Sequence, residues 1–152
     1  QEQPVDWIID IATLTGAARV ALGTDLPGFF SNEQQVIDLL MLSGTEADDP
    51  IWPLPLYHDY KKLTVSPIAD LKNAASGGYG GAITAALFLD HFVQNDQPWA
   101  HFDLMAENVK AKAGRPLGGE IMGMQAVLLA ITKVLNDRQL ISKKIEQGAA
   151  VS

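Results

Sequence analysis

The chain reads VDWIIDIATL at Val5–Leu14, a run rich in β-branched and aromatic residues. The run is short for a helix, so it predicts a buried strand of a parallel or mixed sheet, ending at the turn signal Thr15-Gly16. A second run of the same kind, WAHFDLM at Trp99–Met105, predicts another buried strand. Two strands far apart in the sequence are therefore expected in one sheet.

Helices are expected between and after these strands. Val36, Leu39 and Leu40 fall on one stripe of a predicted helix, which Ser31 or Asn32 caps and Gly44 ends. Further expectations are helices at 82–93 and 121–135, a small-residue stretch at 16–23, a loop at 24–32, an extended connection at 45–56, a short helix at 58–63 and a short strand at 68–71. This alternation predicts an α/β fold with a mixed central sheet and helices on both faces.

Composition limits the possible functions. The 152 residues are 47% hydrophobic, carry a net charge of −7 and include no cysteine. We expect one domain over residues 1–136 and a polar, flexible tail over 137–152. The acidic charge disfavours nucleic acid, no apolar run is long enough to cross a membrane, and no secretory signal is seen, so a cytoplasmic protein is expected. The missing initiator Met and the early apolar run are typical of a fragment.

A glycine cluster, Gly77, Gly78, Gly80 and Gly81, leads into the helix expected at 82–93. Such a cluster could cradle a phosphate, but a P-loop needs Lys and Ser or Thr after the last glycine. Here Ala and Ile follow instead. The favoured interpretation is a tight turn that needs positive φ angles.

His101 and Asp103 lie two apart in a predicted strand, so their side chains share one face. They could form a metal pair or an acid/base dyad, but a buried histidine satisfied by a hydrogen bond is favoured. Asp48 and Asp49 precede Pro50 and are expected to be solvated turn residues. From the residues alone, the chain is an acidic α/β domain without a self-contained active site.

Six segments of the chain form a recognisable series: IIDIATLTGAARVALG (8–23), GFFSN (28–32), WPLPL (52–56), IADLKN (68–73), GGAITAALFLDHFV (80–93) and WAHFDL (99–104). In this order and at similar spacing, they resemble segments of leucyl aminopeptidases of the cytosol aminopeptidase family. The resemblance covers residues 5 to about 135. It identifies the chain as the carboxy-terminal part of the catalytic domain.

The resemblance implies a two-metal exopeptidase, a hexamer that removes amino-terminal residues from peptides with zinc, manganese or magnesium. The family's metal ligands lie on an upstream lysine and aspartates and on the N-T-D-A-E-G-R motif, whose Arg acts through bound bicarbonate. Neither the motif nor the upstream stretch occurs in this chain. No catalytic residue and no metal ligand is therefore assigned here. The chain alone is expected to hold no metal and to be inactive until the upstream part of the same protein joins it.

What the resemblance carries over is substrate contact at Thr13, Leu14 and Gly16, where backbone groups freed at a strand end pair with the peptide. A plain strand-to-turn connection is the alternative. The chain departs from the family's sequence pattern at three places. Met105-Ala106 stands where the family usually has Ala-Gly, Asn108 lies near a specificity pocket, and the loop at 113–120 also differs. The alternative function is a non-catalytic binding or assembly domain that keeps the fold.

Overall fold

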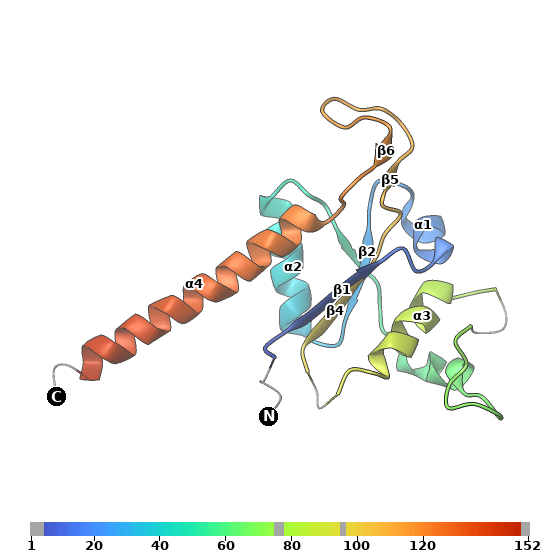
Figure 1. Ribbon diagram of the computed structural model, residues 1–152, viewed down its shortest axis with the longest axis horizontal. Coiled ribbons are helices and arrows are strands. Elements are labelled where there is room, and N and C mark those ends of the chain that lie inside the picture. Colours follow the sequence, from blue (N-terminus) through green and yellow to red (C-terminus); the bar gives the residue numbers. More distant parts are fainter. Residues whose placement is uncertain (1–4, 75–77, 95–96, 150–152) are drawn as a thin grey trace.

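The computed structural model contains a mixed four-stranded sheet (Figure 1). It describes residues 5–74, 78–94 and 97–149, with side chains described up to residue 138. The strands, in spatial order, are β1 (Ile8–Ala12), β4 (Trp99–Asp103), β2 (Gly28–Ser31) and β3 (Trp52–Pro53). The pairs β1–β4 and β2–β3 are parallel, and β2–β4 is antiparallel. The predicted mixed sheet is confirmed.

The register between β1 and β4 fixes which side chains share a face. Asp10 pairs with His101 and Ala12 pairs with Asp103. Because side chains alternate along a strand, His101 and Asp103 lie on one face and Phe102 on the other. Phe102 stacks on Phe29 of β2, with the ring centroids 5.4 Å apart.

Helices cover both faces of the sheet, as predicted. On the face of Phe102, α2 (Gln34–Glu46) and α4 (Met124–Ala149) enclose the larger core. On the opposite face, α1 (Gly16–Leu22) and α3 (Gly81–Asp90) contribute Ala18, Ala82 and Ala86 to a second core around Trp99. The remaining elements are the 3₁₀ helix η1 (His58–Thr64) and the two-stranded hairpin β5 (Glu107–Asn108) and β6 (Gly118–Gly119).

Three short segments differ from the sequence predictions. The GFFS segment was expected in a loop, but it forms β2, in which all four residues are buried between β4 and β3. The stretch at 16–23 forms α1, because its small residues let the helix approach the sheet closely. The strand expected at 68–71 is a series of bends instead, and Ile68 there is exposed to solvent.

The ends of α2 and α4 also differ from prediction. Glu33, rather than Ser31 or Asn32, caps α2, because the Ser31 hydroxyl donates to the carbonyl of Trp99. Gly44 lies inside α2, where a Cβ atom would be 3.0 Å from the carbonyl oxygen of Asp49. Helix α4 does not end at residue 135 but continues to Ala149 and projects from the domain (Figure 1). The flexibility of residues 137–152 stays a prediction.

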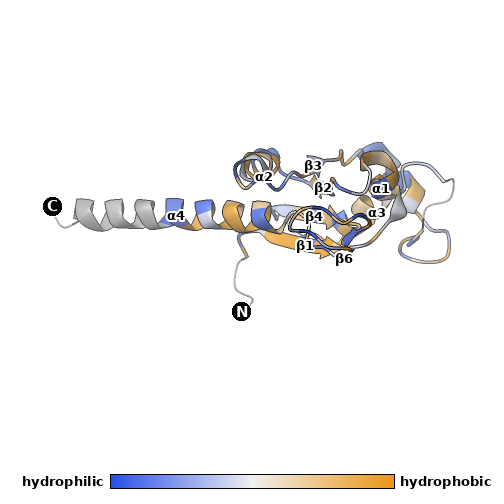
Figure 2. Ribbon diagram, turned by 90° about the horizontal axis from the view of Figure 1, so that it is seen from above, coloured by the Kyte–Doolittle hydropathy of each residue, from blue (hydrophilic) through white to orange (hydrophobic). Residues whose placement is uncertain are grey.

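Strand β1 lies at the edge of the sheet and leaves apolar surface uncovered. Ile11 is 44% exposed, and Ile8 is also exposed. A groove beside the strand is lined by Trp7, Ile9 and the apolar residues Ile131, Val134 and Leu135 of α4. Figure 2 shows this apolar character along β1 and the first turns of α4. Within the described part of the chain, none of the helices combines the length and apolar character of a membrane span.

Candidate functional site

The loop from Thr13 to Thr15 joins β1 to α1 and is held by a carboxylate from β4. The Oδ1 atom of Asp103 accepts hydrogen bonds from the backbone N–H groups of Leu14, at 3.1 Å, and Thr15, at 2.9 Å. Its Oδ2 atom accepts a third from the Thr15 hydroxyl, at 2.5 Å. Asp103 is only 2% exposed, so this charged group is fully committed to the loop.

Thr15 also begins the helix that follows. Its backbone is extended, and its hydroxyl oxygen accepts a hydrogen bond from the N–H of Ala18, at 3.4 Å, which makes it the N-cap of α1. The first N–H groups of a helix have no partner within the helix, and that of Gly16 is one of them. Thr13, Leu14 and Gly16 are exposed positions just after the end of β1. Their contact with a peptide stays a prediction.

A cavity of about 570 Å³ opens beside this loop. Its lining includes Leu14 and Thr15 of the loop, Thr84 of α3 and Tyr79. Its volume is in the range of small-ligand pockets. The other lining residues are Ala17, Val20, Ala21, Thr64, Lys72, Asn73, Ala74, Gly78, Gly80, Gly81 and Ala85.

The glycine cluster forms the turn into α3 at the rim of this cavity. Gly78 and Gly80 have φ angles of +71° and +66°, which side-chain-bearing residues rarely adopt. The carbonyl of Gly80 accepts the N–H of Thr84, at 3.0 Å. The interpretation as a tight turn is confirmed for these two positions, while Gly77 lies outside the described residues.

His101 is fully buried, which agrees with the favoured interpretation, but only its Nδ1 atom is hydrogen-bonded, because its Nε2 atom is buried without a partner among the described residues. Its Nδ1 atom lies 2.5 Å from Oδ1 of Asp10, and the other oxygen of Asp10 accepts the indole N–H of Trp99, at 2.6 Å. Asp103 instead bonds to the loop after β1. The two residues therefore serve different partners, and the dyad considered from the sequence is not formed.

The described residues do not provide the ligands of a two-metal centre. Among residues 5–74, 78–94 and 97–138, no three His, Asp or Glu side chains come together. The most buried carboxylate near the loop, that of Asp103, has both oxygens occupied by hydrogen bonds. A pair of divalent metals does not fit these residues.

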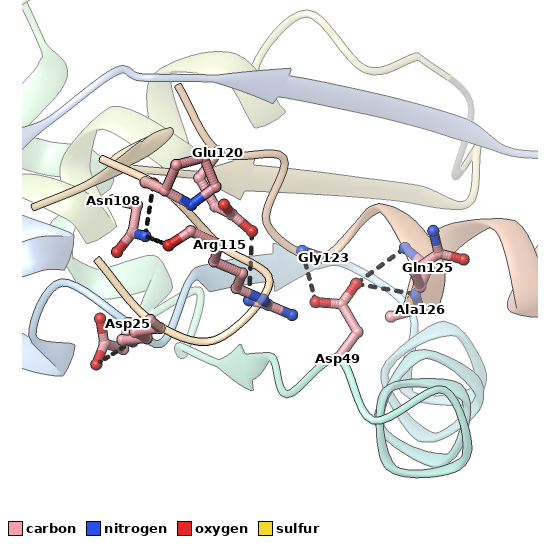
Figure 3. A network of polar contacts seen from close by, with 10 residues as sticks. Asp25, Asp49, Asn108, Arg115, Glu120, Gly123, Gln125 and Ala126 are labelled. Atoms are coloured by element: carbon pink, nitrogen blue, oxygen red, sulfur yellow. Dashed lines mark hydrogen bonds and ion pairs between the residues drawn. The ribbon is translucent and has the colours of Figure 1, made fainter. Parts of the chain in front are cut away.

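The positions that depart from the family pattern have structural roles. Asn108 is buried, and its amide donates to the carbonyls of Arg115, at 2.9 Å, and Pro116, at 2.8 Å, which closes the hairpin loop (Figure 3). Arg115 pairs with Glu120 at 3.3 Å. Ala106 keeps a left-handed backbone with φ of +54°, the conformation that glycine adopts without strain.

Asp49 is a buried residue, and the prediction that it is a solvated turn residue is wrong. Its carboxylate accepts the backbone N–H groups of Gly123, at 3.1 Å, Gln125, at 2.9 Å, and Ala126, at 3.3 Å (Figure 3). It thereby caps the start of α4. No local sequence pattern indicates this role, because the partners lie 74 to 77 residues away.

Comparison with known proteins gives a consistent result. A family model described as "Cytosol aminopeptidase family, catalytic domain" matches residues 1–130. The cytosol aminopeptidase of Encephalitozoon cuniculi is 45% identical over 68% of this chain and 21% of its own length. Peptidase B of Pectobacterium atrosepticum is 48% identical over 69% of this chain and 24% of its own length.

A solved structure matches as well. The crystal structure of the cytosol aminopeptidase from Coxiella burnetii superposes with a TM-score of 0.80 and 48% identity. The match covers 84% of this chain and 28% of that protein. The matched region spans between 19% and 26% of the length of curated relatives such as these.

Proposed function

This chain belongs to the cytosol aminopeptidase family, and we propose that it is the peptide-binding portion of an aminopeptidase that removes amino-terminal residues. The observation that carries the proposal is the loop after β1, with exposed backbone groups at Thr13, Leu14 and Gly16 beside a cavity. An extended peptide has unpaired N–H and C=O groups of its own, and such a strand end can pair with them.

The chain's own contribution is to bind and orient the peptide. The backbone groups of the loop fix the direction of the substrate chain, and the adjacent cavity of about 570 Å³ accommodates one of its side chains. Fixing a substrate in one orientation lowers the entropic part of the barrier of the later bond cleavage.

The metal ions of the family, manganese, zinc or magnesium, bind outside this chain. The described residues support this part of the proposal, because no three carboxylate or imidazole side chains come together among them. The upstream part of the same polypeptide supplies the ligands and the catalytic groups, so the 152 residues alone are inactive. We therefore assign no catalytic residue to this chain.

The open edge of β1 is where the upstream part docks. The outer edge strand and the groove lined by Trp7, Ile9 and Ile131 expose apolar surface that favours burial. The relatives are about four to five times longer than the matched region, so they have ample chain to cover it. The assembled protein is cytoplasmic and hexameric in this proposal.

The coding sequence that precedes Gln1 tests the proposal. An N-T-D-A-E-G-R motif in frame, a short distance upstream, is the expected result. Elemental analysis of the purified 152-residue chain should show no bound manganese or zinc after dialysis, and metal should appear only when the upstream part is present. Two tightly bound metals per isolated chain would overturn the proposal.

The alternative is a non-catalytic binding or assembly domain with the aminopeptidase fold. It is favoured by the same lack of a metal-ligand cluster among the described residues. An upstream coding sequence without the motif would support this function over the first one.

A further inference from the structure

We infer that Asp103 is a positioning residue, which orients the loop so that two carbonyl groups face the peptide substrate. The inference rests on the proposed function of that loop. Asp103 itself does not contact the substrate, because its side chain is buried and its carboxylate accepts hydrogen bonds from the loop.

The geometry of the peptide unit determines where the carbonyl groups of the loop point. A trans peptide group is planar, with its N–H and its C=O pointing in opposite directions. Among the described residues, which include this loop, all peptide bonds are trans. When Asp103 accepts the N–H of Leu14, the carbonyl of Thr13 in the same peptide unit must face away from Asp103. When it accepts the N–H of Thr15, the carbonyl of Leu14 must do the same.

A single carboxylate oxygen therefore sets the orientation of two successive carbonyl groups. Neither carbonyl has a hydrogen-bond partner among the described residues. Both are acceptors, and the partner that suits them is the N–H of an extended peptide. The third bond of Asp103 fixes the Thr15 hydroxyl, which in turn caps α1, so the N–H of Gly16 is held in the same arrangement.

The buried strand β4 constrains the exposed loop through Asp103. Asp103 ends β4, which lies between β1 and β2 and is buried along its whole length. The loop is exposed, and 88 residues separate Asp103 from Thr15 in the sequence. The rigid strand thus imposes the conformation of the loop, rather than the reverse.

Variants of Asp103 separate positioning from simple packing. In Asp103→Asn, the amide oxygen can accept both backbone N–H groups, and the amide nitrogen can donate to the Thr15 hydroxyl. In Asp103→Leu, a side chain of similar size leaves all three donors without a partner. If the leucine variant does not fold, Asp103→Ser replaces it. The serine side chain is too short for its hydroxyl to reach both N–H groups, so this variant also removes the hydrogen bonds to the loop. Asp49→Leu is the matched control, because it removes three hydrogen bonds from a buried carboxylate at α4 instead.

Amide hydrogen exchange of the ¹⁵N-labelled 152-residue chain is the first measurement. After correction for global stability, the N–H groups of Leu14 and Thr15 should exchange about tenfold faster in Asp103→Leu or Asp103→Ser. They should stay close to wild type in Asp103→Asn and in Asp49→Leu. Unchanged protection in both the leucine and the serine variants would overturn the inference.

Titration with the dipeptide leucyl-leucine, followed by amide chemical shifts, is the second measurement. The wild-type chain should show shifts centred on Thr13–Gly16, weak because no metal contributes. Asp103→Asn should retain them, while Asp103→Leu loses them at unchanged secondary structure. If wild type shows no shifts, the proposed peptide contact fails, even where exchange supports the role of Asp103 in the loop. If Asp103→Leu binds as wild type does, the positioning role fails while the proposed function stands.

Discussion

Two buried aspartates hold two different segments of the molecule, the start of α4 and the loop after β1, with different hydrogen-bond patterns. Asp49 accepts only backbone N–H groups, one on Oδ1 and two on Oδ2, at the start of α4. Asp103 accepts two backbone N–H groups on Oδ1 and a hydroxyl on Oδ2. A hydroxyl can reverse its role and accept, whereas a backbone N–H cannot. An amide can therefore replace Asp103 but not Asp49.

Among substitutions that keep the side chain's shape or add a single methyl group, the largest effect is expected from Asp49→Asn. The amide nitrogen would face at least one N–H group that has no other acceptor, and a buried unsatisfied donor costs about 1 to 3 kcal/mol. The free energy of unfolding, measured by urea denaturation, should fall by that amount. A loss as small as that of Asp103→Asn would remove the distinction between the two sites.

Gly44→Ala should perturb the Asp49 region through α2, the helix that contains Gly44. A Cβ atom at this position would lie 3.0 Å from the carbonyl oxygen of Asp49 and 3.1 Å from the side chain of Ile51. Overpacking costs about 1 to 3 kcal/mol, partly offset by the better helix propensity of alanine. The urea midpoint should fall by less than in Asp49→Asn, and a rise in the midpoint would show that Asp49 can move away from α2.

Thr15→Val should weaken the Asp103 region by about 1 kcal/mol, the usual value of a lost N-cap. The hydroxyl both donates to Asp103 and caps α1 through Ala18. Thr15→Ser keeps the hydroxyl and serves as the control. Thermal unfolding followed by circular dichroism measures both variants, and equal midpoints for the two would argue against the cap.

Asp103→Asn should cost less than about 1 kcal/mol, since every hydrogen bond of the carboxylate has an amide equivalent. Urea denaturation of this variant next to Asp49→Asn provides the direct comparison. A loss of several kcal/mol would mean that the negative charge itself stabilises the loop.

The smallest effect belongs to an exposed carboxylate, that of Asp6. A hydrogen bond from the Arg138 guanidinium, at 2.7 Å, holds the pKa of Asp6 below its ordinary value of 3.8. A lowered pKa in the folded state stabilises the fold above the ordinary value and loses this contribution as the pH falls below it. Solvent screens such a pair, so the unfolding free energy should barely change in Asp6→Asn. A carboxyl ¹³C titration should show the pKa rising towards 3.8 in Arg138→Ala.

Some elements of the fold are marked by local sequence patterns, and others depend on pairing with distant segments. The strands around Trp99 and Ile9 and the helix α3 carry strong local patterns, and they were predicted correctly. Strand β2 was missed because four residues next to Pro27 are typical of a loop. Their strand conformation depends on pairing with β4 and β3, which lie on either side of them in the sheet. Asp103 was placed on the right face, but its partners could not be known, because they depend on the register of β1 against β4.

The proposed peptide contacts at Thr13, Leu14 and Gly16, by contrast, are predicted only from the resemblance to the family. The ATLTG segment has no periodicity or motif that marks a ligand site. The role proposed for it depends on the buried Asp103 and on a cavity lined by residues of α1, α3 and the turn at Gly80. Such long-range arrangements are set by tertiary packing rather than by local propensity.

Hydrolysis of leucine p-nitroanilide with added manganese tests the central claim most directly. Two proteins should be compared, the 152-residue chain alone and the same chain extended by its upstream coding sequence. The account predicts turnover only for the extended protein, because this chain supplies peptide binding and the upstream part supplies the metal ligands. Metal-dependent turnover by the 152 residues alone would contradict it.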